Sequence, residues 1–242
     1  MLSQLRQLWQ EAFGDSEETI KDFFATGFCP DRYHYICHGD TPVSALYWFD
    51  CQLEGQKIAY IYALATRKSH RGQGLAHRLM AETHEILKEQ GYAGAVLVPA
   101  EGLSPFYAEI GYRTVGYIHP FICQAGGEPV ALREIDTDEF ARLRRKYLPA
   151  GGVLQEGPAL DWLHTYAKFY AGEDFLFSAA TEGDTLLVQE FLGNTAPAQG
   201  ILVTLGLASG RFRTPGTGQD FAMFLPLTPD CPTPSYFGLA LD

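Results

Sequence analysis

The residues with the clearest chemical potential form a short basic loop that follows a strand-like run. Arg67, Lys68 and Arg71 place three cations within five residues, although the whole chain has only 18 Lys and Arg. Gly72 and Gly74 come next, where a helical segment begins. Glycines let the backbone approach a ligand closely, and the N–H groups at a helix N-terminus attract negative charge. The pattern predicts a site for a phosphate or pyrophosphate group.

Two common kinds of phosphate-binding loop do not match this sequence. A nucleotide P-loop needs a Lys directly after its last glycine, and no Lys follows Gly74. A dinucleotide loop needs a third glycine at the position that His77 occupies. A tight turn with basic residues kept for solubility would also explain a bare Gly-x-Gly. The residues alone therefore indicate either an anion site of another class or a simple helix start.

The elements on both sides of the loop must hold it in place. Apolar residues at helical spacing predict two helices before the sheet, over residues 2–13 and 17–24. Runs of β-forming residues predict an antiparallel meander of three strands, over 33–37, 42–51 and 58–66. A helix, a strand, a short helix and a strand follow, over 74–90, 93–99, 104–110 and 112–117. We expect an α/β fold of the α+β kind, in which helices cover the faces of a mixed sheet.

A connector-like run over 124–129 separates this first half from a second one. Beyond it we expect two helices, a hairpin, a helix and a strand pair, over 136–147, 158–170, 175–192, 196–208 and 211–227. We interpret the basic run from Arg142 to Lys146 as a solvated helix face. Because the order of elements echoes the first half, we expect two domains, 1–124 and 125–242, of which the second is a degraded copy.

Two segments together resemble the signature of the GNAT superfamily of N-acetyltransferases. Arg71-Gly-Gln-Gly-Leu-Ala76 resembles the Arg/Gln-x-x-Gly-x-Gly/Ala loop, in which that superfamily cradles the pyrophosphate of acetyl-CoA. The segment from Ala100 to Tyr112 resembles the Phe-Tyr-x-x-x-Gly-Phe/Tyr segment that follows the next strand. The two motifs stand in the expected order, with the expected helix and strand between them. The resemblance implies a GNAT fold, followed here by a degenerate GNAT-like domain.

Within the superfamily the sequence is most similar to the enhanced-intracellular-survival (Eis-like) branch. The shared traits are a Leu-Trp-x-x-Ala-Phe-Gly-Asp opening, the His70-Arg71 step into the loop, and Glu101-Gly102 before the tyrosine segment. That branch carries a GNAT domain, a degenerate GNAT-like domain and a sterol-carrier-like domain. At 242 residues, this chain is long enough for the first two.

The resemblance implies acetyl-CoA as co-substrate and assigns residues to it. The pyrophosphate would lie at the loop, whose residues are Arg71, Gly72, Gln73, Gly74, Leu75, Ala76 and His77. The acetyl and pantetheine groups would lie along Leu64, Ala65 and Thr66, where backbone N–H groups would stabilise the developing oxyanion. Tyr107 would be the general acid, because a phenol with a pKa of about 10 can deliver a proton to the departing thiolate. Packing in the core is the alternative interpretation of Tyr107.

The sequence does not identify the general base. Glu101 matches a position near the cofactor in the Eis-like branch, although a loop carboxylate is commonly solvated. The C-terminal carboxylate acts as base in that branch, which makes Asp242 a second candidate, and a chain of waters is a third. His77 and His84 are seven residues apart, which does not match the spacing of a zinc pair, so we expect no metal site.

Composition limits the classes of partner. The chain is 46% hydrophobic, which supports a folded core, and its formal charge is −11. An acidic surface argues against binding nucleic acid or an anionic membrane, and it suits a cationic partner. The five cysteines are an odd number and contain no Cys-x-x-Cys, so we expect free thiols in the cytoplasm. No signal peptide or membrane span is apparent.

The combined prediction is a cytoplasmic acetyl-CoA-dependent N-acetyltransferase. Its acceptor would be a primary amine on a cationic small molecule or on a lysine side chain, and self-association into a homo-oligomer is left open. The sequence is also compatible with two alternative functions. One is a catalytically silent CoA-binding or regulatory module, and the other is transfer of a longer acyl group on the same scaffold.

Overall fold

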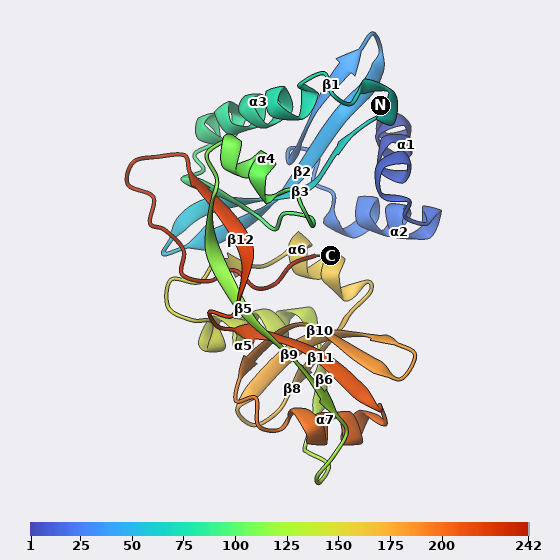
Figure 1. The fold of residues 1–242 in the computed structure, drawn as a ribbon, viewed down its shortest axis with the longest axis vertical. Coiled ribbons are helices and arrows are strands. Elements are labelled where there is room, and N and C mark those ends of the chain that lie inside the picture. The colour runs from blue at the N-terminus through green and yellow to red at the C-terminus, as the bar shows by residue number, and fades with distance from the viewer. Residues whose placement is uncertain (242) are drawn as a thin grey trace.

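A single mixed sheet of 12 strands runs through the protein in the computed structural model, which describes residues 1–241 (Figure 1). Helix α3 packs on one face of the upper part of this sheet, where Leu79 and Met80 meet Trp48 and Ile61. Helices from both halves of the sequence cover the opposite face. The mixed α/β fold expected from the sequence is confirmed. None of the described helices is both long and apolar enough to cross a membrane.

The first half follows the expected order of elements. Two helices precede the sheet, α1 (Leu2–Phe13) and α2 (Glu17–Asp22), and a π-helical turn (Phe23–Gly27) extends the second. The meander consists of β1 (Tyr33–His38), β2 (Thr41–Leu53) and β3 (Gln56–Thr66). The remaining elements are α3 (Leu75–Glu89), β4 (Gly94–Leu97), α4 (Ser104–Glu109) and β5 (Arg113–Gln124).

The second half differs from expectation in several of its strands. Its elements are β6 (Arg133–Ile135), α5 (Thr137–Tyr147), β7 (Leu154–Gln155), α6 (Pro158–His164), β8 (Lys168–Ala171), β9 (Phe175–Glu182), β10 (Thr185–Gly193), α7 (Ala198–Leu205), β11 (Ser209–Pro215) and β12 (Gln219–Pro226). The helix expected over 158–170 is therefore wrong beyond His164, because β8 pairs with both β6 and β9. The expected pairing within 211–227 is also wrong, because β5 lies between β11 and β12.

The two halves exchange strands at the centre of the sheet. In the strand order β1-β2-β3-β4-β12-β5-β11-β10-β9-β8-β6, strand β12 from the second half separates β4 from β5. One end of β5 pairs with β12 and its other end with β11, so this long strand crosses from the upper to the lower lobe (Figure 1). Each lobe thus contains a strand supplied by the other half.

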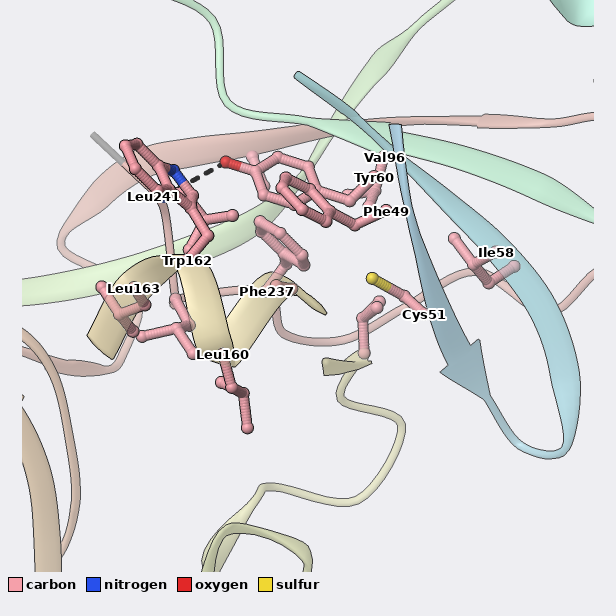
Figure 2. Packing of buried hydrophobic residues seen from close by; sticks show 14 of the residues in the cluster. Phe49, Cys51, Ile58, Tyr60, Val96, Leu160, Trp162, Leu163, Phe237 and Leu241 are labelled. Atoms are coloured by element: carbon pink, nitrogen blue, oxygen red, sulfur yellow. Dashed lines mark hydrogen bonds between the residues drawn. The ribbon is translucent and has the colours of Figure 1, made fainter. Parts of the chain in front are cut away.

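The core on the face opposite α3 also joins the halves. Phe49 and Tyr60 of the meander lie against Trp162 of α6 and against Phe237 and Leu241 of the C-terminal segment (Figure 2). Phe237 is 0% exposed, and its ring lies 4.9 Å from that of Tyr60. The C-terminal segment after β12 therefore returns to the meander and becomes part of the interior.

The basic run on α5 contains a buried member. Arg142 and Arg145 are exposed, as expected, but Arg144 is 0% exposed, which corrects the interpretation of the whole run as a solvated face. Its guanidinium group forms an ion pair with Glu190 of β10, with Nε 2.6 Å from Oε2. A charge taken out of water needs such a partner, and the sequence pattern cannot reveal a partner 46 residues away.

Candidate active site

The basic loop between β3 and α3 is shaped by glycine and held by α1. Gly72 and Gly74 have φ values of +74° and +71°, in the left-handed region that favours glycine, and open space surrounds both. Gly74 immediately precedes α3, whose first-turn N–H groups have no helical partners. Glu11 of α1 accepts a hydrogen bond from the Lys68 N–H at 2.7 Å and pairs with Arg67 at 2.8 Å. The loop is therefore preformed, and Arg67 serves to anchor it.

The other loop residues leave an exposed basic surface. Lys68, Arg71 and Gln73 are exposed, and Arg71 Nε donates to the Thr66 carbonyl at 3.2 Å. Leu75 and Ala76 are half-buried in the first turn of α3. The exposed cations and the free N–H groups at one helix start can hold a pyrophosphate, as the sequence predicts.

His77 connects this helix to α4, which carries the tyrosine segment. Its ring lies 4.6 Å from the ring of Phe106 in an edge-to-face contact. Its Nε2 lies 3.5 Å from a carboxylate oxygen of Glu109. The two sequence motifs are thus neighbours in space, since one residue of the loop motif packs directly on the other motif.

Strands β3 and β4 stop pairing where the predicted acetyl site lies. They are parallel and pair at three positions, the last being Tyr60 with Val96. Beyond this point β3 has a bulge against β2, and Ala63 takes a positive φ of 51°. Leu64 lines the cavity that opens there, whereas Ala65 is buried and Thr66 Oγ1 shares a hydrogen bond with Ser44. A bulge next to unpaired strand ends leaves backbone N–H groups for a ligand.

A cavity of about 790 Å³ occupies this opening. Its walls come from α1, α2, β3, α6 and the segment between β4 and α4, and from the C-terminal segment. Tyr60, Tyr62 and Trp162 supply aromatic surface. Residues from both halves therefore build one site.

Tyr107 lies in the wall of this cavity. It is 7% exposed, its ring makes edge-to-face contacts with Phe106 and Tyr112, and its hydroxyl has no hydrogen-bond partner among the described residues. Burial raises the pKa of Tyr107 to about 12. The phenol is therefore protonated at neutral pH, as a proton donor must be. Tyr107 is thus packed in the core and also in contact with the cavity, so core packing, the alternative interpretation given above, does not by itself exclude a role as general acid.

One side of the cavity is acidic. Asp15, Glu18 and Asp22, which flank and form α2, belong to its lining, and no Lys or Arg does within residues 1–241. Three carboxylates on a wall that no described Lys or Arg lines create a negative potential in a partly enclosed space. This side of the cavity favours a positively charged molecule.

Hydrogen bonds fix the C-terminal segment against this cavity. The Leu241 N–H donates to Tyr60 Oη at 3.3 Å (dashed in Figure 2), and Tyr62 Oη donates to the Leu241 carbonyl at 3.0 Å. Trp162 Nε1 donates to Tyr62 Oη at 3.1 Å. Leu241 itself lines the cavity, whereas Asp242 lies outside the described residues.

Glu101 occupies a different position from the other candidates. It lies in the turn between β4 and α4, its side chain is exposed, and it is not among the residues that line the cavity. The described structure therefore brings together the loop, Leu64 and Tyr107, but leaves Glu101 at the surface.

Several residues of the cavity have no signal in the sequence. Trp162, Tyr166 and Leu241 reach it from more than 90 residues beyond β3, through the exchange of segments between the halves. The acidic residues of α2 stand in an ordinary amphipathic helix. Of the site residues predicted from the sequence, Leu64 and Tyr107 line the cavity.

A comparison with protein families gives one match. Residues 1–115 match the family model described as an acetyltransferase (GNAT) domain. This region contains the loop, the gap between β3 and β4, and Tyr107. No curated protein matches the chain.

Solved structures of similar fold cover nearly all of the chain. A GCN5-related N-acetyltransferase from Anabaena variabilis has a TM-score of 0.74 at 16% identity, over 94% of this chain and 70% of that one. One from Kribbella flavida has a TM-score of 0.69 at 21% identity, over 93% and 69%. Eis1 from Mycobacterium abscessus has a TM-score of 0.65 at 12% identity, over 93% and 71%. At these identities the likeness shows a shared fold that includes the second half.

Proposed function

We propose that this protein transfers an acetyl group from acetyl-CoA to a primary amine, because residues 1–115 match the model of the acetyltransferase (GNAT) domain. One observation carries the proposal. The gap between β3 and β4 opens into the cavity that contains Tyr107, and the glycine loop stands at the start of the adjacent helix α3. A pyrophosphate site, a thioester site and a proton donor are thus arranged along one path.

Each part of this path has a task in the proposed reaction. Acetyl-CoA supplies the activated acetyl group, its pyrophosphate held by the N–H groups around Gly72 to Ala76 and by the charge of Arg71. Backbone N–H groups of β3 near Leu64 stabilise the negative oxygen that forms when the amine attacks the thioester carbon. As the C–S bond breaks, Tyr107 donates its phenolic proton to the departing sulfur. The acceptor gives one proton to the base to become a neutral amine before it attacks. It loses a second proton as the amide forms, and this proton returns to Tyr107 and restores its phenol.

We propose a cationic amine as acceptor, bound at the acidic side of the cavity. A primary amine is an ammonium ion at neutral pH, and Asp15, Glu18 and Asp22 would attract it into the cavity. The base is the carboxylate of Asp242, which follows the anchored Leu241, or a water in the cavity. Glu101 is the alternative base, but its exposed side chain does not line the cavity.

The second half has a structural part in this proposal. Residues 125–242 are a degenerate GNAT-like unit that closes the cavity with α6 and the C-terminal segment, while residues 1–124 carry the cofactor site. Support comes from Trp162 and Leu241, which line the same cavity as Tyr107. We also propose a cytoplasmic location. The oligomeric state is a separate question, which light scattering would answer.

Thermal stability in the presence of acetyl-CoA tests the cofactor site. A ligand at 100 times its Kd stabilises the folded state by about 2.7 kcal/mol, roughly 5–11 °C for a chain of this size. Gly74→Val should abolish this shift, because it places side-chain atoms where the pyrophosphate binds. Gly127→Val is the matched control, since Gly127 also has a positive φ of 74° in open space but lies in the connector. Equal loss in both variants would point to general destabilisation.

Release of free thiol from acetyl-CoA tests turnover. A panel of polyamines, aminoglycosides and lysine peptides should give release above background with at least one cationic amine. Binding without turnover on the whole panel would favour the silent module. Faster release from a longer acyl-CoA than from acetyl-CoA would favour transfer of a longer acyl group.

A further inference from the structure

The lower lobe repeats the geometry that opens the acetyl site in the upper lobe. Strands β3 and β4 are joined through α3, pair in parallel at three positions, and then separate. Strands β10 and β11 are joined through α7, also pair in parallel at three positions, from Thr185 with Ser209 to Leu187 with Arg211, and pair no further. Each first strand has a bulge against its antiparallel neighbour just beyond the last parallel pair, at Ala63 in β3 and at Gln189 in β10.

A second cavity lies at this repeated opening. Its volume is about 440 Å³, and its walls are residues of β10, β11, β5 and β12. Leu187 and Gln189 of β10 line it, whereas Leu186 and Phe191 of β10 pack in the cluster with α7. The cavity therefore opens on the face away from the crossover helix. In the first cavity Tyr60 and Tyr62 likewise belong to the core on the face away from α3, although Ile61, which packs with α3, also contributes to the lining.

The charge of the second cavity is opposite to that of the first. Arg211 and Arg213, two residues apart on β11, line it, and no Asp or Glu does among the described residues. The Arg211 guanidinium is exposed and has no hydrogen-bond or ion-pair partner in residues 1–241. The Arg213 guanidinium is half-buried and lies 4.7 Å from the centre of the Phe221 ring. In a chain of net charge −11, such a cavity is selective for anions.

A buried amide provides an independent sign of a ligand. Gln189 is 6% exposed, lines the cavity, and its Oε1 is buried without a hydrogen-bond partner among the described residues. Buried polar groups in proteins are normally satisfied, so an orphaned one indicates a missing partner. Because an amide can turn by 180°, Gln189 can donate to an oxyanion or accept from a hydroxyl.

We propose that this second cavity is a binding site for a small oxyanion, a carboxylate or a phosphate ester that carries an apolar group. Arg211 and Arg213 bind the oxyanion, since guanidinium groups match both carboxylate and phosphate. Gln189 supplies the buried polar contact, and Ile118, Leu187 and Phe221 cover the apolar part. The proposal does not depend on the acetyl-transfer reaction.

The site is not a second acetyl-CoA site. The segment before α7 is Asn194-Thr-Ala-Pro197, which contains neither glycine nor a basic residue. The chain there lacks the open glycine backbone and the cations that the first loop offers to a pyrophosphate. The two openings thus share a backbone geometry but differ in the chemistry of their ligands.

Calorimetric titration of the full-length protein at constant ionic strength tests the proposal. The probes are inorganic phosphate, acetate, phenyl phosphate and benzoate. We expect saturable binding of at least one phenyl compound, tenfold or more tighter than its counterpart without the ring. The better of the two ring compounds distinguishes a phosphate ester from a carboxylate as the natural ligand class.

Two variants and one control connect this binding to the cavity. Arg211→Gln and Arg213→Gln should each weaken the binding at least tenfold, while Arg142→Gln, the same change on an exposed face of the same half, should leave it unchanged. Unliganded melting curves verify that the variants are folded. No saturable binding by any probe, or binding that survives both variants, would overturn the proposal. So would a change of molar mass in light scattering caused by these variants, which would make this face a subunit interface.

Discussion

Replacing Arg144 with methionine should destabilise the protein by about 3–5 kcal/mol, the usual cost of leaving one charge of a buried ion pair alone. The pair is well shielded, because Arg144 and Glu190 are 0% and 1% exposed. Two hydrogen bonds join them, from Nε to Oε2 at 2.6 Å and from Nη2 to Oε1 at 3.0 Å. The loss should appear as a lower urea midpoint with an unchanged slope.

A double variant separates the charge from the packing. Arg144→Met with Glu190→Leu removes both charges and should recover most of the lost stability, because apolar residues of similar size replace buried pairs well. The remaining cost is about 1–3 kcal/mol for the hydroxyl of Tyr236, which donates to Glu190 Oε1 at 3.1 Å and would lose its acceptor. The reasoning is refuted if the single variant loses less than about 1 kcal/mol, or if the double variant is no more stable than the single one.

The same pair should influence the acceptor cavity through the C-terminal segment. Arg144 Nη2 contacts Gln155 Oε1 at 3.4 Å, and Gln155 Nε2 donates to the Leu239 carbonyl at 2.7 Å. Loss of Arg144 frees this segment, so we expect KM for the amine to rise while the thermal shift with acetyl-CoA is retained. Arg142→Met, a change on the exposed face of the same helix, should alter neither quantity.

Three further predictions concern single side chains. Tyr107→Phe should lower kcat about 100-fold or more without reducing the acetyl-CoA thermal shift, and an unchanged kcat would exclude Tyr107 as the acid. Because burial raises the pKa of Tyr107 to about 12, ionisation of its phenol should cause no loss of activity up to about pH 10. Glu18→Gln with Asp22→Asn should raise KM for cationic amines severalfold in low salt and by less in 0.5 M salt, since the distance over which exposed charges interact falls from about 10 Å at 0.1 M to about 3 Å at 1 M salt. Equal KM ratios at both salt concentrations would count against the acidic wall. Burial lowers the pKa of His84 to about 4, so between pH 6.5 and pH 4 this side chain is protonated in the unfolded chain but neutral in the folded protein. The free energy of unfolding should therefore fall by about 2 kcal/mol between pH 7.5 and pH 5. Denaturation of His84→Gln at both pH values should show a smaller difference than the parent protein.

The parts of the site that the sequence predicted are contiguous in the chain. The loop from Arg71 to His77 and the segment that ends at Tyr112 are each recognised by the spacing of residues within one short segment. Such spacing can be read from the sequence without knowledge of the fold. The meander and both flanking helices were predicted for the same reason, since their periodicity is local. The assignments of Glu101 and Asp242 to a base, and the division at residue 124, stay predictions.

The parts that were wrong depend on contacts between distant segments. Residues 158–170 keep apolar residues at helical spacing, but Phe169 and Ala171 are drawn into a strand by pairing with β6 and β9. The turn between Pro215 and Gln219 resembles a hairpin, yet β5 takes the place between the two strands. Arg144 looked solvated because its neighbours are, and only the position of Glu190 on β10 explains its burial.

The exchanged strand has a consequence for the protein during its synthesis. Strand β4 gains its second neighbour only when β12, beginning at Gln219, has left the ribosome. The roughly 95 residues between Gln124 and Gln219 require about 5–20 s at 5–20 residues per second. During that interval a hydrophobic strand edge in the upper lobe stays open to other chains. The nascent protein should therefore depend on chaperones during this interval, and its cavity should form only after the segment that contains Leu241 has been made.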